Sequence, residues 1–295
     1  MHVPAQSYKV GERGAWLGIF SNIILFVVKL FAGIVGRSQA MIADAFHTAS
    51  DALTSIGVFV GFKIAERPAD AHHPFGHGRA ESIMAKIVSI VLIFVGLGIA
   101  INSGKILISG ELHEPGSIAL VVAVISIIVK EITYRLVIKA SKEIDSASLK
   151  ADAYHHRSDV LSSVAALVGI AGAKMGHMFM DPLAGIIVAG FIIKIGVESF
   201  HKAYDELMDA APPEVLKKNI EKAILGVGGV KEVKRIMVRK TGIELFIEVI
   251  IGVDGDITVN EGHSITVRTE EAVEKDIMNV RDVLVHVEPC GVTCK

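Results

Sequence analysis

Repeated stretches of mostly apolar residues, most of them long enough to cross a membrane, restrict the fold of this chain more than any other feature. Residues 14–36 form the first stretch. A helix rises about 1.5 Å per residue, so this stretch spans the roughly 30 Å hydrocarbon core of a bilayer. Comparable stretches follow at 40–64, 81–103, 149–174 and 182–200, and a shorter apolar run at 118–129 continues into a stretch where charged and apolar residues alternate. We therefore predict an α-helical bundle of six transmembrane helices over residues 14–206, preceded by a short polar segment at 1–13.

The last third of the chain has a different pattern. The whole sequence is 51% hydrophobic and 21% charged, which suits a membrane domain joined to a soluble one. Beyond the Pro212-Pro213 pair, alternation replaces the long apolar runs. The expected elements are a helix at 214–225, strands at 230–240 and 243–253 around a Thr241-Gly242 turn, a helix from an Asn260 cap to Asp276, and a strand at 283–288. This αββαβ order predicts a small α+β domain at 207–289, with its helices on one face of an open sheet and a tail at 290–295.

Two pairs of ionisable residues lie within the apolar stretches. His47 and Asp51 are four residues apart, so a helix places both on one face. The same spacing returns in His155 and Asp159, at the start of the fifth stretch. Two imidazoles and two carboxylates make a tetrahedral set of ligands for a borderline divalent metal such as zinc.

A structural explanation competes with this one, because a single His or Asp near a helix end is often a cap or a satisfied interior group. The recurrence favours function, since ionisable residues in membrane spans are costly and usually line a pathway. Asp44 and Asp152 each precede a motif histidine by three residues and are expected to shape the entrance without binding metal. Lys29 is expected to be paired or snorkelling. Lys130 is expected in an amphipathic extension of the fourth helix beyond the bilayer.

A histidine-rich loop follows the second stretch, at residues 66–79. Its Pro and Gly residues prevent a regular helix and indicate a shaped loop. Asp70, His73 and His77 are candidates for a second, more exposed metal site, in which His72 could replace one of them. The alternative is a polar interfacial loop that happens to contain several histidines.

The distribution of basic residues predicts the orientation. Six spans put both termini on one side of the membrane. That side carries Lys9, Arg13, Lys63, Arg67, Arg79, Arg135, Lys139, Lys142, Lys150 and Lys202, whereas the other carries Arg37, Lys105 and Lys174. The positive-inside rule then makes the termini and the C-terminal domain cytoplasmic, in the cytoplasmic membrane of a prokaryote. The net charge of -2 gives no reason to expect a nucleic-acid partner, and two cysteines near the C-terminus form no disulfide framework.

Together these features resemble the cation diffusion facilitator family of divalent-metal exporters over nearly the whole chain. The resemblance rests on six spans, two His-x-x-x-Asp pairs, the Phe-Gly-His-Gly-Arg-Ala-Glu loop, and Glu206-Leu207-Met208-Asp209 leading into the small domain. It implies a ferredoxin-like cytoplasmic domain, a homodimer in the lipid membrane and proton-driven antiport.

The resemblance also implies roles for particular residues. It assigns the transport site to His47, Asp51, His155 and Asp159, and a loop site to Asp70, His73 and His77. It further implies an ion pair between Arg79, after the loop, and Asp209, at the domain junction.

The C-terminal domain departs from the pattern of the family. His263, His286 and Glu288 are candidate metal ligands there. Lys234 and Ile250, however, occupy positions where relatives carry histidines. Two alternatives remain: a reduced metal site that Cys290 and Cys294 join as soft ligands, or a disordered tail.

The expected function is secondary active transport, with Zn²⁺ as substrate and possible regulator, and no enzymatic activity. Metal binding requires neutral imidazole and ionised carboxylate, so metal and protons compete for the same atoms. His47 and His155 are then both ligands and proton carriers, while Asp51 and Asp159 balance charge. Alternatives are export of manganese, ferrous iron, cobalt, nickel or cadmium, and a membrane-anchored metal sensor. An intramembrane hydrolase is disfavoured because four protein ligands leave no open coordination position.

Overall fold

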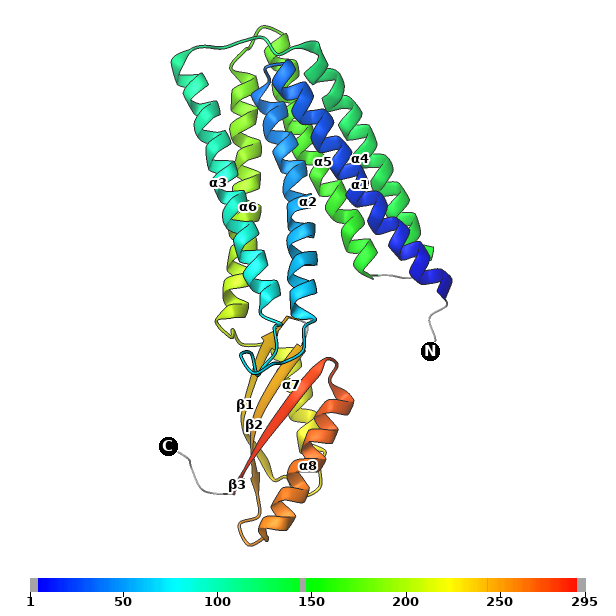
Figure 1. The fold of residues 1–295 in the computed structure, drawn as a ribbon, viewed down its shortest axis with the longest axis vertical. Coiled ribbons are helices and arrows are strands. Elements are labelled where there is room, and N and C mark those ends of the chain that lie inside the picture. Colours follow the sequence, from blue (N-terminus) through cyan, green and yellow to red (C-terminus); the bar gives the residue numbers. More distant parts are fainter. Residues whose placement is uncertain (1–4, 144–146, 243, 291–295) are drawn as a thin grey trace. The chain divides into compact units, whose positions relative to one another are not determined.

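The computed structural model of the chain describes residues 5–143, 147–242 and 244–290 (Figure 1). Within these ranges, the side chains of 5–19, 55, 58, 140–143, 147–152, 155, 156 and 158 lie outside the description. The chain divides into two compact units. The first contains residues 1–57 and 87–200, and the second contains 58–86 and 201–295.

In the described part of the chain, six long helices precede the C-terminal domain, one for each predicted span. They are α1 (Ala5–Val35), α2 (Gln39–Ala65), α3 (Ala80–Ser109), α4 (Ser117–Glu143), α5 (Ala147–Lys174) and α6 (Met180–Leu207). Among the described residues, α3, the Ser117–Lys139 part of α4, and α6 are long and apolar enough to span a membrane, and the described part of α1 is a shorter apolar helix. As predicted, the fourth helix continues without a break past its apolar run and through the charged residues that follow. An Arg135–Glu131 ion pair of 2.7 Å, one turn apart, supports this continuation.

Small residues allow the helices of the first unit to approach closely. A Cβ added to Gly169 of α5 would lie 2.3 Å from the Cβ of Ala184 on α6, so only glycine fits there. Asp181, near the start of α6, accepts hydrogen bonds from the Ser38 hydroxyl at 2.6 Å and the Gln39 backbone N–H at 2.7 Å. Because the first N–H groups of a helix lack partners within it, Asp181 caps α2 from another helix.

The C-terminal domain has the predicted αββαβ order and a ferredoxin-like fold. Its elements are α7 (Glu214–Leu225), β1 (Glu232–Thr241), β2 (Glu244–Val253), α8 (Val259–Asp276) and β3 (Val280–Pro289). The strands lie in the order β1-β2-β3, with β1 and β2 antiparallel and β2 and β3 parallel. Helix α8 forms the crossover that a parallel pair requires.

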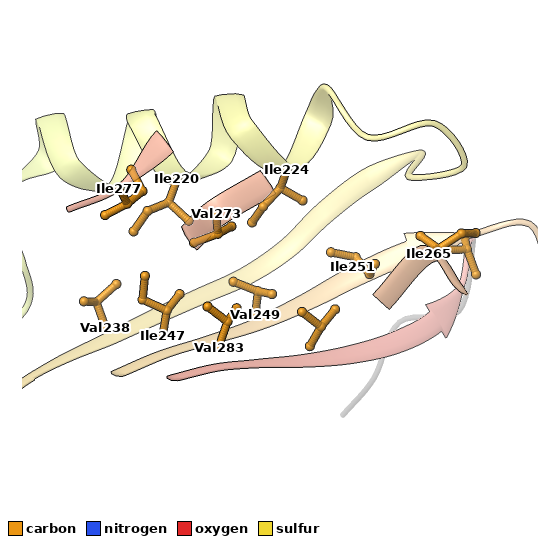
Figure 2. Packing of buried hydrophobic residues seen from close by; sticks show 12 residues of the cluster. Ile220, Ile224, Val238, Ile247, Val249, Ile251, Ile265, Val273, Ile277 and Val283 are labelled. Carbon is orange, nitrogen blue, oxygen red and sulfur yellow. The ribbon is translucent and has the colours of Figure 1, made fainter. Parts of the chain in front are cut away.

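Alternating residues of the sheet build the core of this domain. On β2, the side chains of Ile247, Val249, Ile251 and Val253 are buried and point to one face. Figure 2 shows Ile247, Val249 and Ile251 opposite apolar residues of α7 and α8, and all of these residues belong to one buried cluster. Both helices therefore cover the same face of the sheet, as the sequence predicted.

The start of α8 differs from the prediction. Thr258 is the N-cap, and Asn260 lies inside the first turn. The Thr258 hydroxyl accepts the N–H of Glu261 at 3.2 Å, and the Glu261 carboxylate accepts the N–H of Thr258 at 2.8 Å. The prediction of Asn260 as the cap was wrong because Thr258 and Glu261 form a reciprocal capping box, which satisfies two backbone donors at once.

Candidate metal centres

Two residues from the two predicted motifs lie close together inside the helical unit. His47 on α2 and Asp159 on α5 are both buried. The Nε2 atom of His47 is 4.0 Å from Oδ1 of Asp159. A tetrahedral ion with ligand bonds of about 2 Å holds its donor atoms roughly 3.3 Å apart, so these two atoms need to approach by less than about 1 Å to bind one ion. The other ring nitrogen of His47 has no hydrogen-bond partner among the described residues.

The other members of the predicted site are placed less completely. Asp51 lies one turn after His47 on α2, is partly buried and interacts electrostatically with that imidazole. His155 and Asp152 lie in α5, but their side chains are outside the described residues. The structure thus brings His47 and Asp159 together, with Asp51 on the same helix as His47.

Sequence reasoning missed Lys130 as a neighbour of this site. The residue was expected on an extension beyond the bilayer, yet its side chain is only 2% exposed. Its Nζ atom lies 3.4 Å from Oδ2 of Asp159. The available signal was the rule that a charged residue in a membrane-length helix usually has a buried partner. The sequence did not indicate which face of α4 is turned towards α5.

A second buried lysine is held by a hydrogen-bonded network. Lys29 on α1 lies 2.7 Å from Oδ2 of Asp44 and donates to the hydroxyls of Thr48 at 3.0 Å and Ser163 at 3.1 Å. Asp44 also accepts hydrogen bonds from the hydroxyls of Ser162 and Ser163. Lys29 is therefore paired, which is one of the two roles expected for it. Asp44 connects α1, α2 and α5 in the interior of the bundle, whereas the sequence predicted that it shapes an entrance.

The loop between α2 and α3 brings three potential ligands together. One ligand atom each from Asp70, His73 and His77 lies within 4.8 Å of the others, the only such group of three found among the described residues. Nδ1 of His73 is 3.4 Å from Oδ1 of Asp70, and Nε2 of His77 is 3.6 Å from Oδ2. Gly76 supports the turn with a φ of 82°, which non-glycine residues rarely adopt. His72 contributes its backbone N–H to Asp70.

The environment of Asp70 favours its ionised, metal-binding form. The backbone N–H of His73 lowers the pKa of Asp70 from its ordinary value, and the N–H of His72 and the two histidine rings add to this effect. A cavity of about 450 Å³ adjoins the loop and is lined by His73, His77 and Arg79, among others. An ion could therefore reach the three ligands from solvent.

Two cationic side chains fix the surroundings of the loop. Arg79 donates to Asp209 at 2.7 Å, the pair that the family resemblance implied. Arg239 of β1 lies over the rings of Phe75 and Phe246, with its guanidinium carbon 5.4 and 5.9 Å from their centroids.

The candidate ligands of the C-terminal domain are arranged differently. Nε2 of His286 is 3.5 Å from Oε1 of Glu288. Lys234 lies 2.9 Å from the other oxygen of Glu288 and also donates to the carbonyl of Pro289. His263 lies on α8, Cys290 is exposed, and Cys294 is outside the described residues. An ammonium group thus already neutralises the buried carboxylate of this predicted site.

Comparison with known proteins identifies the family. Residues 15–208 match the cation efflux transmembrane domain, and residues 212–290 match the cytoplasmic domain of cation efflux proteins. The chain belongs to the cation diffusion facilitator family. Cation diffusion facilitators are transporters and not enzymes, and they are multi-pass membrane proteins.

Several relatives match along almost their whole length. The manganese efflux system protein MneP of Bacillus subtilis (strain 168) is 34% identical over 95% of this chain and 97% of its own. An uncharacterised transporter of Methanocaldococcus jannaschii is 37% identical over 94% of this chain and 98% of its own. The magnetosome protein MamM of Magnetospirillum gryphiswaldense is 34% identical over 92% of this chain and 86% of its own. A solved structure of the MamM C-terminal domain covers 26% of this chain and 96% of its own at 30% identity, with a TM-score of 0.25.

Proposed function

We propose that this cation diffusion facilitator exports Zn²⁺ from the cytosol in exchange for protons, through a site formed by His47, Asp51, His155 and Asp159. The observation that carries the proposal is the buried approach of His47 to Asp159, at 4.0 Å, from two helices far apart in sequence. Asp51 follows His47 by one turn, and the equivalent spacing places His155 one turn before Asp159. Two nitrogen and two oxygen ligands suit zinc, which is tetrahedral and of borderline softness.

Proton exchange follows from the chemistry of these ligands. Zinc binds neutral imidazole and ionised carboxylate, so protons and metal compete for the same atoms. An acidic exterior favours release of the metal, and the higher pH of the cytosol favours its binding. Uphill Zn²⁺ flux should therefore slow when an ionophore collapses a pH gradient that is acidic outside.

Manganese is the second candidate substrate. Two relatives, MneP and MneS of Bacillus subtilis, are named as manganese efflux system proteins and are 34% and 28% identical to this chain. Manganese prefers oxygen ligands, however, and the proposed site has two imidazoles. The choice between the ions thus depends on whether His47 is a ligand, and this can be tested directly.

The test replaces His47 with aspartate in proteoliposomes and compares Zn²⁺ and Mn²⁺ flux in competition. A carboxylate makes the site richer in oxygen, so Mn²⁺ should gain on Zn²⁺. A tenfold change in the ratio corresponds to about 1.4 kcal/mol. His113→Asp is the matched control, because it makes the same chemical change on an exposed loop residue. A folded, active His47→Asp protein with the wild-type ratio would show that His47 does not bind the transported ion.

The remaining assignments belong to the same proposal. The loop site at Asp70, His73 and His77 holds a second metal ion on the cytoplasmic side, and the 207–289 domain dimerises. The Arg79–Asp209 ion pair lies at the domain junction and orders the start of α3. A metal sensor of the same architecture would bind Zn²⁺ without moving it, so measurable flux in vesicles separates the two functions.

A further inference from the structure

Lys130 has a contact with the proposed transport site that is different in kind from an ordinary structural ion pair. Its ammonium group lies 3.4 Å from Oδ2 of Asp159, while His47 lies 4.0 Å from Oδ1 of the same carboxylate. All three side chains are at most 5% exposed. A buried cation therefore occupies one side of the carboxylate that we propose as a metal ligand.

Lys29, the second buried lysine among the described side chains of the bundle, provides the comparison. An ammonium group has three N–H donors, and Lys29 contacts three oxygens at 2.7 to 3.1 Å, from Asp44, Thr48 and Ser163. Lys130 has the Asp159 contact at 3.4 Å, and its ammonium makes no hydrogen bond within the described residues. Lys29 is thus fixed by its surroundings, whereas Lys130 is held mainly by charge.

We propose that Lys130 is a tethered cation that neutralises Asp159 in the empty transport site and is displaced when the metal ion binds. The inference rests on the proposed role of Asp159 as a ligand. A zinc ion bound to Oδ1, on the side of His47, lies about 2 Å from that oxygen, and its two positive charges repel the ammonium group at Oδ2 across the same carboxylate. Lysine is suited to this exchange because it is a compact charge on a flexible four-carbon stem.

The exchange of Lys130 for the metal ion would keep the charge of the buried site balanced. An unpaired carboxylate buried between helices is costly, so an empty site with two ionised aspartates would need compensation. Lys130 supplies one positive charge when the metal is absent. Its charge also acts on His47, the proposed ligand nearest to Asp159, and on Asp44. Because the metal ion must displace this ammonium group in order to bind Asp159, the lysine weakens metal binding and speeds metal release.

Removing the charge should therefore tighten metal binding and slow turnover. In Lys130→Met, which keeps the length of the side chain, the metal no longer competes with an ammonium group. We expect the Kd for Zn²⁺ to fall about tenfold or more, and both KM and kcat for transport to fall with it. Lys130→Arg retains the charge and should keep binding close to that of the wild type.

The experiment measures Zn²⁺ binding by calorimetry to the full chain in lipid nanodiscs. All variants carry Asp70→Asn, which removes the loop site from the signal. Asp159→Asn in this background defines the binding that belongs to the transport site. The double variant Lys29→Met/Asp44→Asn is the control for loss of a buried lysine, because it removes that lysine without leaving its carboxylate unpaired. The inference predicts tighter Asp159-dependent binding in Lys130→Met and no tightening in the double variant.

The outcomes separate the inference from the function on which it rests. If Asp159→Asn leaves Zn²⁺ binding intact, the proposed transport site is wrong. If Asp159→Asn removes binding but Lys130→Met leaves the Kd unchanged or raises it, only the role of Lys130 is wrong. If Lys130→Met folds only when Zn²⁺ is added, the metal has replaced the missing charge, which supports the inference. If it fails to fold with Zn²⁺ as well, Lys130 is a purely structural residue and the inference is overturned.

Discussion

Replacing Lys29 with methionine should strongly destabilise the helical unit. Lys29 and Asp44 are both fully buried, and their charged atoms are 2.7 Å apart. The substitution keeps the volume of the side chain but removes its positive charge. Asp44 would then retain only the hydroxyls of Ser162 and Ser163 as hydrogen-bond partners among the described residues.

The expected cost is about 3–5 kcal/mol, the usual effect of removing one partner from a buried ion pair. The upper part of this range applies here, because Asp44 is completely enclosed and Lys29 also satisfies Thr48 and Ser163. The double variant Lys29→Met/Asp44→Asn removes both charges. It should recover much of the loss, since no buried charge is left without a partner and an amide still accepts the serine hydroxyls.

The assay is thermal unfolding of the detergent-solubilised protein, with wild type, both single variants and the double variant compared as a cycle. The double variant should unfold at a higher temperature than Lys29→Met, although it carries an additional substitution. Equal stability of Lys29→Met and wild type, or a double variant as unstable as the sum of the two single changes, would refute the charge argument.

Four further predictions concern the second unit. Ile251→Ala should destabilise the C-terminal domain by about 2–5 kcal/mol in urea unfolding, because Ile251 is fully buried in its core. Thr258→Ala should cost about 1 kcal/mol of stability through loss of the α8 cap. The backbone N–H and the hydroxyl of Thr258 lower the pKa of Glu261 in the folded state. The stability that this carboxylate contributes is therefore fully present above its ordinary pKa and is lost as the pH falls through the lower pKa of the folded state. Glu261→Gln should therefore flatten the acid side of the stability profile. Asp70→Asn should lower the Zn²⁺ stoichiometry of the full chain in calorimetry, whereas an unchanged stoichiometry would exclude the loop as a site.

Local patterns in the sequence predicted most of the fold. The long apolar runs, the change to alternation after Pro212-Pro213 and the Thr241-Gly242 turn indicated six helices and the αββαβ domain, which are present. These features follow from the periodicity of helices and strands and need no knowledge of distant contacts. The cap of α8 was misplaced because two polar residues near the helix start compete, and the winner is decided by the reciprocal contact of Thr258 with Glu261.

The roles of the buried charges depended on packing between helices, which local patterns do not contain. The sequence showed that Lys29 needed a partner, yet Asp44 is its partner only because α1 and α2 pack at that level. Lys130 was assigned to a solvated extension because Glu131, Arg135 and Lys139 follow it on α4. On a helix, however, neighbouring residues point in different directions. Lys130 therefore contacts Asp159 in the interior, although Arg135 and Lys139 on the same helix are exposed. A charge within a membrane-length helix should therefore be assigned a buried partner before it is assigned to solvent, and the carboxylates of a predicted metal site are the first partners to consider.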